Sequence, residues 1–487
     1  MATSVKKLTT TEQAFLQQVE AAVFSNPFSE KRAAAFIDII QRTPLPDAPE
    51  KQRDMVESRI HEFMQSLSKK GWIYTEYRSG DTELIRNGHL FEVYLNCLES
   101  FDALIPKQID APDRSLPVPF ARKMIQDLIG RGFGHPEAVR AFTMFFQLRR
   151  AYAFIAQSLS GSSPCMREFR SQLWRTLFTD NINFYEQHLW DRMEDFSILL
   201  LGETGTGKGS AARAIGLSGF IPFDDGDGCF KESFTGNFVS LNLSQYPESL
   251  IESELFGHRK GAFTGAIEHH TGALSRCRPY GAIFLDEIGD VSIPIQIKLL
   301  QVLQERTFSP VGSRDCLPFQ GRVIAATHQP LQERRAEGSF RDDFYFRLCT
   351  DTITVPTLRQ RIQEWPDALP ELVHILCTRI TGLGSGELPQ RVLDSLKKSL
   401  PDHYAWPGNV RELEQAIRRI IICGVYTGEP SSPKNGIDGL LREGKLTANE
   451  LMSRYCRQMY EQFGSYEEVA RRLDLDRRTV KKYIDLT

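Results

Sequence analysis

The amino-acid sequence predicts a multidomain chain with a mainly helical N-terminal domain, an α/β domain with a helical lid, and a C-terminal helix-turn-helix. Three observations predict this fold class. Apolar residues recur at helical spacing through the first part of the chain, and two short helical patterns close it. In the middle, short apolar runs at 196–201, 281–285 and 322–326 alternate with helical patterns. The length of 487 residues also exceeds what one hydrophobic core normally organises.

Composition excludes several classes of protein. With 41% hydrophobic and 25% charged residues, the sequence is typical of folded globular chains and unlike disordered, fibrous or membrane proteins. The net charge of -3 requires any nucleic-acid contact to come from a local basic patch. The nine cysteines are scattered without a CxxC pair, which favours a reducing compartment and argues against a zinc module. Because neither a secretory leader nor a run of ~18 apolar residues occurs, we expect a cytoplasmic protein without membrane contact.

The first domain is predicted to be helical over residues 1–158. Thr9 to Glu12 has the form of a helix capping box. Stretches with Pro, Gly or Asp, such as Pro44 to Asp47 and Gly80-Asp81, are expected to separate the helices. A cluster of small residues at 159–164 is expected to end the domain. Helical spacing is found at 32–40, 55–67, 90–104 and 138–159.

A glycine-rich loop follows the first of the buried strands expected in the α/β domain. Residues 202–208 read Gly-Glu-Thr-Gly-Thr-Gly-Lys and stand between the apolar run 198–201 and a helical pattern at 211–215. Strand, loop and helix in this order are the context of a phosphate-binding P-loop, whose backbone N–H groups surround phosphate oxygens while Lys208 adds a charge. A glycine-rich turn with a surface lysine is the weaker alternative. The residues expected to bind ATP here are Gly202, Glu203, Thr204, Gly205, Thr206, Gly207, Lys208, Gly209 and Ser210.

Two adjacent carboxylates end a second apolar run, Ile283-Phe284-Leu285. Asp286 is expected to hold Mg²⁺ and Glu287 to polarise the attacking water, because phosphoryl transfer depends on positioning and charge neutralisation. The pair by itself is more often the N-terminus of a helix. The Ser or Thr that normally binds the metal after the P-loop lysine is here Gly209, so Asp286 gains importance.

A third motif lies between these two. Residues 261–266 read Gly-Ala-Phe-Thr-Gly-Ala, a sequence that resembles the GAFTGA loop of the sigma-54-dependent transcription activators, which are AAA+ ATPases. Small residues flank Phe263 and Thr264, so the loop would present an aromatic side chain that needs a partner. A loop with Phe263 packed into the core is the alternative. The resemblance implies contact with sigma-54 through Gly261, Ala262, Phe263, Thr264, Gly265 and Ala266.

The resemblance extends over roughly residues 161–425. It implies that Asn242 acts as a switch on Glu287, and that Thr327 is the sensor I residue. It also implies that Arg341 and Arg347 are arginine fingers reaching a neighbouring subunit, which requires a ring, and that Arg411 is sensor II. Any one of these arginines by itself would be read as a surface charge or a local salt bridge.

The sequence also departs from the family. Gly209 replaces the usual glutamate after the P-loop lysine, and His328 replaces the usual asparagine after the sensor I threonine. Residues 180–195 and 220–237 look like insertions. The second contains Asp224-Asp225-Gly226-Asp227-Gly228, but lacks the distal glutamate of a calcium loop, so we expect a solvated surface loop.

The C-terminal patterns at 466–473 and 477–484 are similar to the Fis-type helix-turn-helix that ends many such activators. Its second helix would enter the major groove of double-stranded DNA. A helical hairpin that caps a domain is the alternative. The residues expected to bind DNA are Arg477, Arg478, Thr479, Lys481 and Lys482.

The expected domains are residues 1–158, a regulatory domain; 159–357 and 358–426, the AAA+ α/β subdomain and its helical lid; 427–445, a linker; and 446–487, the helix-turn-helix. The resemblance implies an activator that binds DNA upstream of promoters as a hexameric ring and uses ATP and Mg²⁺ to remodel sigma-54 RNA polymerase. Two alternatives stay open. One is another AAA+ remodelling ATPase, and the other is an ATPase-deficient DNA-binding regulator.

Overall fold

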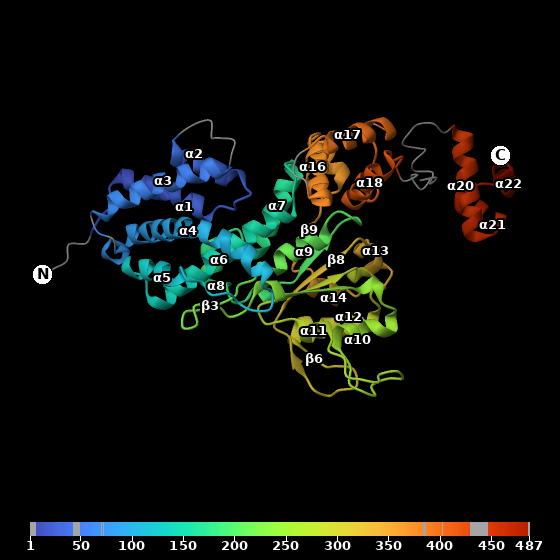
Figure 1. Cartoon of the computed structure of the whole chain (residues 1–487). Helices are drawn as coiled ribbons and strands as arrows, with labels where there is room; N and C mark the ends of the chain where they lie inside the picture. Colours follow the sequence, from blue (N-terminus) through green and yellow to red (C-terminus); the bar gives the residue numbers. More distant parts are fainter. Residues whose placement is uncertain are drawn as a thin grey trace. The chain divides into compact units, whose positions relative to one another are not determined.

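The computed structural model describes residues 6–41, 49–69, 71, 73–382, 386–401, 403–428 and 447–485 (Figure 1). The chain divides into two compact units, residues 1–389 with 408–415, and residues 390–407 with 416–487. Within the described ranges, no helix combines the length and the hydrophobicity that crossing a bilayer requires.

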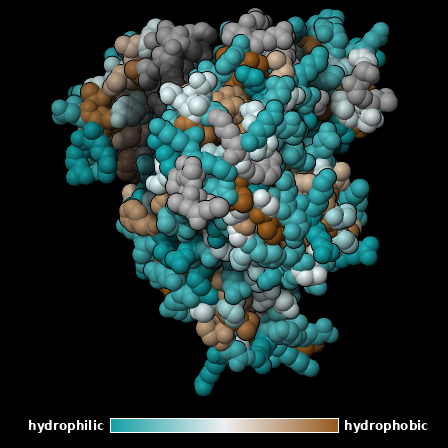
Figure 2. All heavy atoms as spheres, turned by 90° about the vertical axis from the view of Figure 1, so that its left-hand side faces the viewer, coloured by the Kyte–Doolittle hydropathy of each residue, from teal (hydrophilic) through white to brown (hydrophobic). Residues whose placement is uncertain are grey.

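The N-terminal part of the first unit is helical, as predicted (Figure 1). The capping box is confirmed, because the Thr9 side chain accepts from the Glu12 backbone N–H while the Glu12 side chain accepts from that of Thr9. The helices are α1 (Thr10–Phe24), α2 (Glu30–Ile40), α3 (Pro49–Ser68), α4 (Ser79–Asp110), α5 (Ala121–Gly130) and α6 (His135–Ser158), with a short η1 (Tyr74–Glu76) before α4. On the side that Figure 2 shows, hydrophilic side chains predominate and hydrophobic ones lie in small separate groups.

The predicted break at Gly80-Asp81 is wrong, because both residues lie in the first turn of α4. Asp81 is fully buried there and accepts a hydrogen bond from the Leu8 backbone N–H at 2.9 Å. It also pairs with Arg78 at 2.8 Å. These contacts stabilise a helix start that local sequence alone disfavours. The other predicted break, Pro44 to Asp47, lies outside the described residues.

A parallel five-stranded sheet forms the centre of the first unit, in the order β4-β5-β8-β1-β9. The strands predicted from apolar runs are confirmed, and β1 lies between β8 and β9. The fifth strand, β9, was not predicted, because its sequence Asp-Thr-Ile-Thr contains one apolar residue, Ile353, and shows no apolar run. The bounds are β1 (Ile198–Leu201), β4 (Phe238–Asn242), β5 (Ala282–Asp286), β8 (Arg322–Thr327) and β9 (Asp351–Thr354).

Helices and two hairpins surround this sheet (Figure 1). Before β1 come α7 (Pro164–Phe178), α8 (Ile182–His188) and η2 (Met193–Asp195). After β1 come α9 (Lys208–Gly216), the hairpin β2 (Phe223–Asp224) with β3 (Cys229–Phe230), η3 (Phe234–Gly236), η4 (Leu243–Gln245), α10 (Glu248–Phe256) and α11 (Ala273–Arg276). After β5 come η5 (Ile288–Asp290), α12 (Ile293–Glu305), the hairpin β6 (Thr307–Phe308) with β7 (Leu317–Pro318), α13 (Leu331–Ala336) and α14 (Asp342–Leu348).

One hydrophobic core joins α4, α5, α6 and α7 to α9 and to one face of the sheet. Phe146 of α6 stacks on Phe230 of the β2–β3 hairpin with ring centroids 4.4 Å apart. Gln147 of the same helix donates to the carbonyl of Ser218, just after α9, at 3.2 Å. The opposite face of the sheet packs against α10, α12 and α14 in a second core. Helices α4, α5 and α6 are therefore continuous with the core of the α/β domain.

The remaining helices are α15 (Leu358–Glu364), α16 (Ala368–Thr381), α17 (Leu388–Ser399), α18 (Asn409–Cys423), α20 (Ala448–Phe463), α21 (Tyr466–Leu473) and α22 (Arg477–Asp485). The last three pack against one another. Val469 and Val480 are buried between α21 and α22. The predicted linker 427–445 lies almost wholly outside the described residues.

Candidate nucleotide-binding site

The glycine-rich loop joins β1 to α9, and Lys208 is the first residue of that helix. Gly207 precedes it with φ of 108°, a conformation that glycine adopts without strain. A Cβ atom on Gly205 would lie 2.2 Å from the carbonyl oxygen of Gly408, so only glycine fits that close approach. The loop therefore presents backbone N–H groups at the N-terminus of a helix, an arrangement suited to phosphate.

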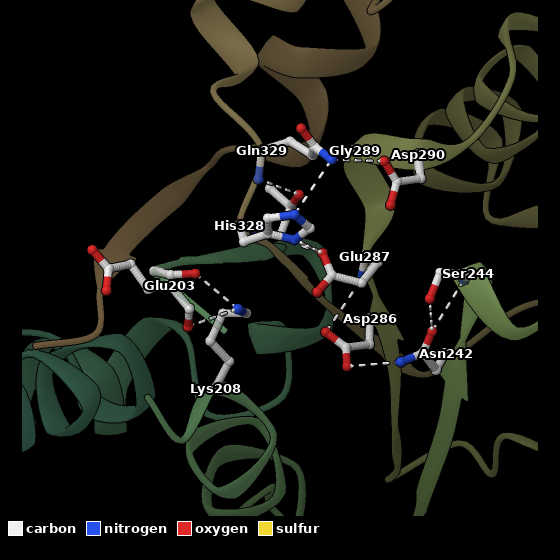
Figure 3. A network of polar contacts seen from close by, with 12 residues as sticks. Glu203, Lys208, Asn242, Ser244, Asp286, Glu287, Gly289, Asp290, His328 and Gln329 are labelled. Carbon is white, nitrogen blue, oxygen red and sulfur yellow. Dashed lines mark hydrogen bonds and ion pairs between the residues drawn. The ribbon is translucent and has the colours of Figure 1, made fainter. Parts of the chain in front are cut away.

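Lys208 lies within the concave side of this loop (Figure 3). Its Nζ donates to the carbonyl oxygens of Gly202 at 2.8 Å and Glu203 at 3.3 Å. Burial lowers the pKa of Lys208, and the nearby carboxylates of Glu287 and Asp286 partly oppose that shift. The lysine charge is thus held where two acidic side chains from β5 also converge.

Asp286 and Glu287 end β5, and the structure brings both to the P-loop, as predicted. Burial raises the pKa of Asp286, and the charge of Glu287 raises it further. Two adjacent carboxylates at a half-buried position suit a divalent cation, because its charge would relieve their repulsion. Asn242 Nδ2 donates to Asp286 Oδ2 at 3.3 Å, so the amide expected to contact Glu287 binds its neighbour instead (Figure 3).

Glu287 contacts the loop after β8. Its Oε2 accepts from the ring Nδ1 of His328 at 2.7 Å and from the His328 backbone N–H at 3.3 Å. Thr327, the preceding residue, is fully buried at the end of β8, and its hydroxyl accepts from the Gln329 backbone N–H at 3.0 Å. Glu287 itself has φ of 57°, in the left-handed region that costs a non-glycine residue conformational energy.

Two arginines without a predicted site role also contact the P-loop. Arg359 of α15 forms a two-pronged ion pair with Glu203, in which Nη1 lies 2.9 Å from Oε2. Arg361 is buried and donates from Nη2 to the Thr206 carbonyl at 2.9 Å. Both arginines lie within residues 355–361, Val-Pro-Thr-Leu-Arg-Gln-Arg, and their contacts with the P-loop are long-range in sequence. Arg411, the predicted sensor II residue, is exposed beside Gly205.

The two predicted arginine fingers lie on or next to α14, and each binds a residue of its own chain. Arg341 pairs with Asp343 at 2.7 Å. Arg347 donates from Nε and Nη2 to the Leu303 carbonyl at 3.1 and 2.9 Å. Among the described residues, no hydrogen bond or ion pair joins either arginine to Lys208, Asp286 or Glu287 of the same chain.

The loop at 261–266 closes on itself. The Gly261 N–H donates to the Ala266 carbonyl at 2.8 Å, and both Gly261 and Gly265 have positive φ. Phe263 is 39% exposed, with its ring edge-on to His258 at 4.9 Å. The base of the loop is fixed by the segment between β6 and β7, because Val311 exchanges backbone hydrogen bonds with Gly257 and Arg259.

The residues expected to bind DNA lie at the start of α22 and along it. Asp476 caps α22, since its side chain accepts from the backbone N–H groups of Arg478 and Thr479 at 2.8 and 2.9 Å. Arg477 pairs with Glu467 of α21 at 2.7 Å. The side chains of Arg478, Lys481 and Lys482 are exposed.

A glycine-rich loop after β1, a lysine at the start of α9 and two carboxylates after β5 define a P-loop nucleotide-binding domain. Residues 183–354 match the family model described as the Sigma-54 interaction domain.

Three known proteins are similar to this chain. It is 37% identical over 271 residues to the DNA-binding transcriptional regulator NtrC of Azospirillum brasilense, covering 56% of this chain and 49% of that protein. It is 42% identical over 230 residues to the sigma54-dependent transcriptional activator SfnR of Pseudomonas putida, covering 47% and 57%. The solved structure of NtrX from Brucella abortus in complex with ATP is 23% identical and overlaps 74% of this chain and 78% of that chain, with a TM-score of 0.41. The chain spans about half the length of the curated relatives it matches.

Proposed function

We propose that this protein is a sigma-54-dependent transcription activator that couples ATP hydrolysis to remodelling of the sigma-54 RNA polymerase closed complex. One observation carries the proposal. Within a sigma-54 interaction domain, the loop at 261–266 presents a partly exposed Phe263 on a closed hairpin that shares no side chain with the nucleotide site. An exposed aromatic side chain on such a loop is available for contact with a partner.

Hydrolysis is assigned to the residues that the fold gathers at the end of the sheet. The P-loop, residues 202–210, would hold ATP, with Lys208 at the β- and γ-phosphates. Asp286 would hold Mg²⁺, which when bound neutralises phosphate charge. Glu287 accepts a proton from water while the water oxygen bonds to the γ-phosphorus and the bond to the bridging oxygen of ADP breaks.

The positions of two arginines support assembly into an oligomer. Arg341 and Arg347 lie outside their own chain's phosphate site, so we assign them to the site of a neighbouring subunit, which implies a homo-oligomeric ring, of six subunits by family resemblance. Arg411 is assigned to the nucleotide of its own chain, because it lies beside Gly205. Asn242 and Thr327 are assigned to the same site through their contacts with Asp286 and the Gln329 backbone.

The domain roles belong to the same proposal. Residues 1–158 form the regulatory part, 159–357 and 358–426 the ATPase and its lid, 427–445 a linker and 446–487 a DNA-binding module. Arg477, Arg478, Thr479, Lys481 and Lys482 would contact double-stranded DNA upstream of the promoter, because a basic second helix is the element that enters the major groove.

The test separates hydrolysis from its use. We expect Phe263→Ala and Thr264→Ala to keep ATP hydrolysis near wild type and to abolish open-complex formation with sigma-54 RNA polymerase. Phosphate release and transcription from a sigma-54 promoter are measured on the same samples. Phe184→Ala is the matched control, because Phe184 is a comparably exposed aromatic residue on α8.

The outcome also decides between the alternatives. Loop variants that still activate transcription, or a wild type that hydrolyses ATP without engaging sigma-54, would assign the chain to another class of AAA+ remodelling ATPase. A wild type that binds DNA and never hydrolyses ATP would leave the ATPase-deficient regulator.

A further inference from the structure

His328 stands where the resemblance to the family implies an asparagine, and it contacts Glu287. His328 occupies the position after Thr327, at the end of β8, and Glu287 lies at the end of the neighbouring strand β5. Figure 3 shows the Glu287 carboxylate directed at the imidazole, while Asp286 is directed at Asn242. The two adjacent carboxylates are therefore held by different partners.

The hydrogen bonds to Glu287 converge on one oxygen. Oε2 accepts from the imidazole Nδ1 at 2.7 Å and from the His328 backbone N–H at 3.3 Å. A carboxylate oxygen has two lone pairs, so both are engaged by one residue. Oε2 in this state has little remaining capacity to accept a proton from water, so that role falls to Oε1, whose direction depends on how the carboxylate is held.

The neighbours of the His328 imidazole determine which ring nitrogen donates a hydrogen bond and which accepts one. Its Nε2 lies 3.4 Å from the Gln329 side-chain amide nitrogen, which is a donor. That nitrogen then accepts, and Nδ1 carries the hydrogen that is donated to Glu287. Gln329 is fixed in turn, because its Nε2 donates to Asp290 Oδ1 at 3.1 Å.

The backbone conformation of Glu287 also indicates that contacts hold this residue in place. A φ of 57° is costly for a residue with a side chain, by about 1 kcal/mol or more, and persists only where surrounding contacts compensate. The hydrogen bonds from His328 are contacts of this kind. Losing the imidazole would therefore free the carboxylate to turn away.

We propose that His328 is a positioning residue that restrains Glu287 in an unproductive orientation, so that the basal ATPase rate is set by release of this contact. The inference rests on the proposed ATPase function and adds its regulation. The restraint acts on the orientation of the carboxylate and not on nucleotide affinity, since no described hydrogen bond joins His328 to the P-loop residues 202–208.

The test uses two substitutions of similar shape, one with a polar amide that can donate to Glu287 and one without any donor. In His328→Asn the side-chain amide nitrogen takes the position of Nδ1 and can still donate to Glu287. In His328→Leu the side chain has the same branching without a donor. We expect His328→Leu to raise basal kcat about threefold to tenfold, the modest net value of one hydrogen bond, with KM for ATP changed less than about twofold. His328→Asn should return kcat toward the wild-type value.

Two controls connect the effect to Glu287. The rise must vanish in the double variant His328→Leu with Glu287→Gln, because no base remains to be released. ATP binding, measured with a fluorescent nucleotide analogue, should be the same in all variants. Full-length protein is used throughout, and a thermal melt of each variant shows whether it is folded.

Other outcomes overturn the proposal. A fall in kcat in His328→Leu that asparagine rescues would mean that the contact orients Glu287 productively. Equal rates in wild type, leucine and asparagine variants would remove any role for the side chain. If the wild type and His328→Leu both bind ATP without turnover, the restraint is excluded. Loss of ATP binding by the wild type would instead contradict the proposed function itself.

Discussion

Asn409 joins three separate segments of the chain through one buried side chain. Its Nδ2 donates to the Glu203 carboxylate at 3.1 Å and to the Thr204 carbonyl at 3.1 Å. Its Oδ1 accepts from the Leu358 backbone N–H at 2.9 Å. Asn409 also begins α18 with φ of 52°. The P-loop and the starts of α15 and α18 are therefore held by a residue far from the P-loop in sequence.

We expect Asn409→Ala to weaken ATP binding and to lower the free energy of unfolding by about 2–4 kcal/mol, because it leaves buried partners unsatisfied and keeps the strained φ. Asn409→Gly removes the same hydrogen bonds but tolerates the backbone conformation, so its free energy of unfolding should exceed that of the alanine variant by about 1 kcal/mol. Equilibrium denaturation and nucleotide titration measure both effects. Equal stability of the two variants would show that the positive φ at residue 409 does not contribute to the loss of stability.

Asp286→Asn is expected to raise the melting temperature by about 1–2 °C at neutral pH while abolishing Mg²⁺-dependent turnover. Burial and Glu287 raise the pKa of Asp286 in the folded state, so its ionised form is disfavoured there. Below the ordinary pKa the carboxyl is protonated in both states and the substitution gains nothing. The gain appears as pH rises toward the raised pKa and is complete above it. Partial exposure keeps the effect small.

Thermal melts of wild type and variant between pH 3 and pH 8 measure this dependence. A gain that is constant with pH would contradict the electrostatic cause.

A fragment of residues 159–487 is expected to aggregate or to lose its cooperative melt. Removal of α6 would expose the hydrophobic core around α9 and the β2–β3 hairpin, including the partner of the Phe146–Phe230 stack. The matched truncation, residues 1–428, removes α20 to α22 and most of the proposed linker, and it should keep both its melt and its ATPase rate. Light scattering measures the aggregation of the two fragments, and circular dichroism measures their melts. A soluble, active 159–487 fragment would show that the shared core is dispensable.

Arg341→Ala and Arg347→Ala are each expected to reduce ATP hydrolysis by about 10³-fold, in the range of arginine fingers. Mixing either variant with Glu287→Gln subunits should partly restore the rate, because intact fingers and intact bases then meet at some interfaces. Phosphate release across mixing ratios measures this rescue. Mixtures that stay inactive at every ratio would exclude a site shared between subunits.

Arg478→Ala combined with Lys482→Ala should weaken DNA binding and reduce the log–log salt slope by about 0.9 for each phosphate group that the variant no longer neutralises. Both side chains are exposed on α22. Arg477→Ala serves as the comparison, since Arg477 is already paired with Glu467 at 2.7 Å and should matter less. Affinity measured by fluorescence anisotropy at several salt concentrations gives the slopes. Unchanged binding in the double variant would leave these helices as a structural hairpin.

The local sequence determined the elements and most of the nucleotide site. Apolar runs predicted β1, β5 and β8, because a strand buried on both faces is apolar throughout, and the glycine pattern predicted the P-loop because backbone close to phosphate excludes side chains. The six-residue match at 261–266 carries the resemblance to the sigma-54-dependent activators. The strand β9 was missed, since its polar residues resemble a loop.

Tertiary structure alone decided the partners. Asn242 donates a hydrogen bond to Asp286, whereas His328 donates one to Glu287. The register of β4, β5 and β8 determines which strand ends lie side by side and therefore which of these side chains meet. Asn409, Arg359 and the core shared by α6 and α9 are likewise long-range, and no local pattern encodes a pairing between distant segments. The sequence thus determined which groups are present, while the packing of the sheet and helices decided which of them touch.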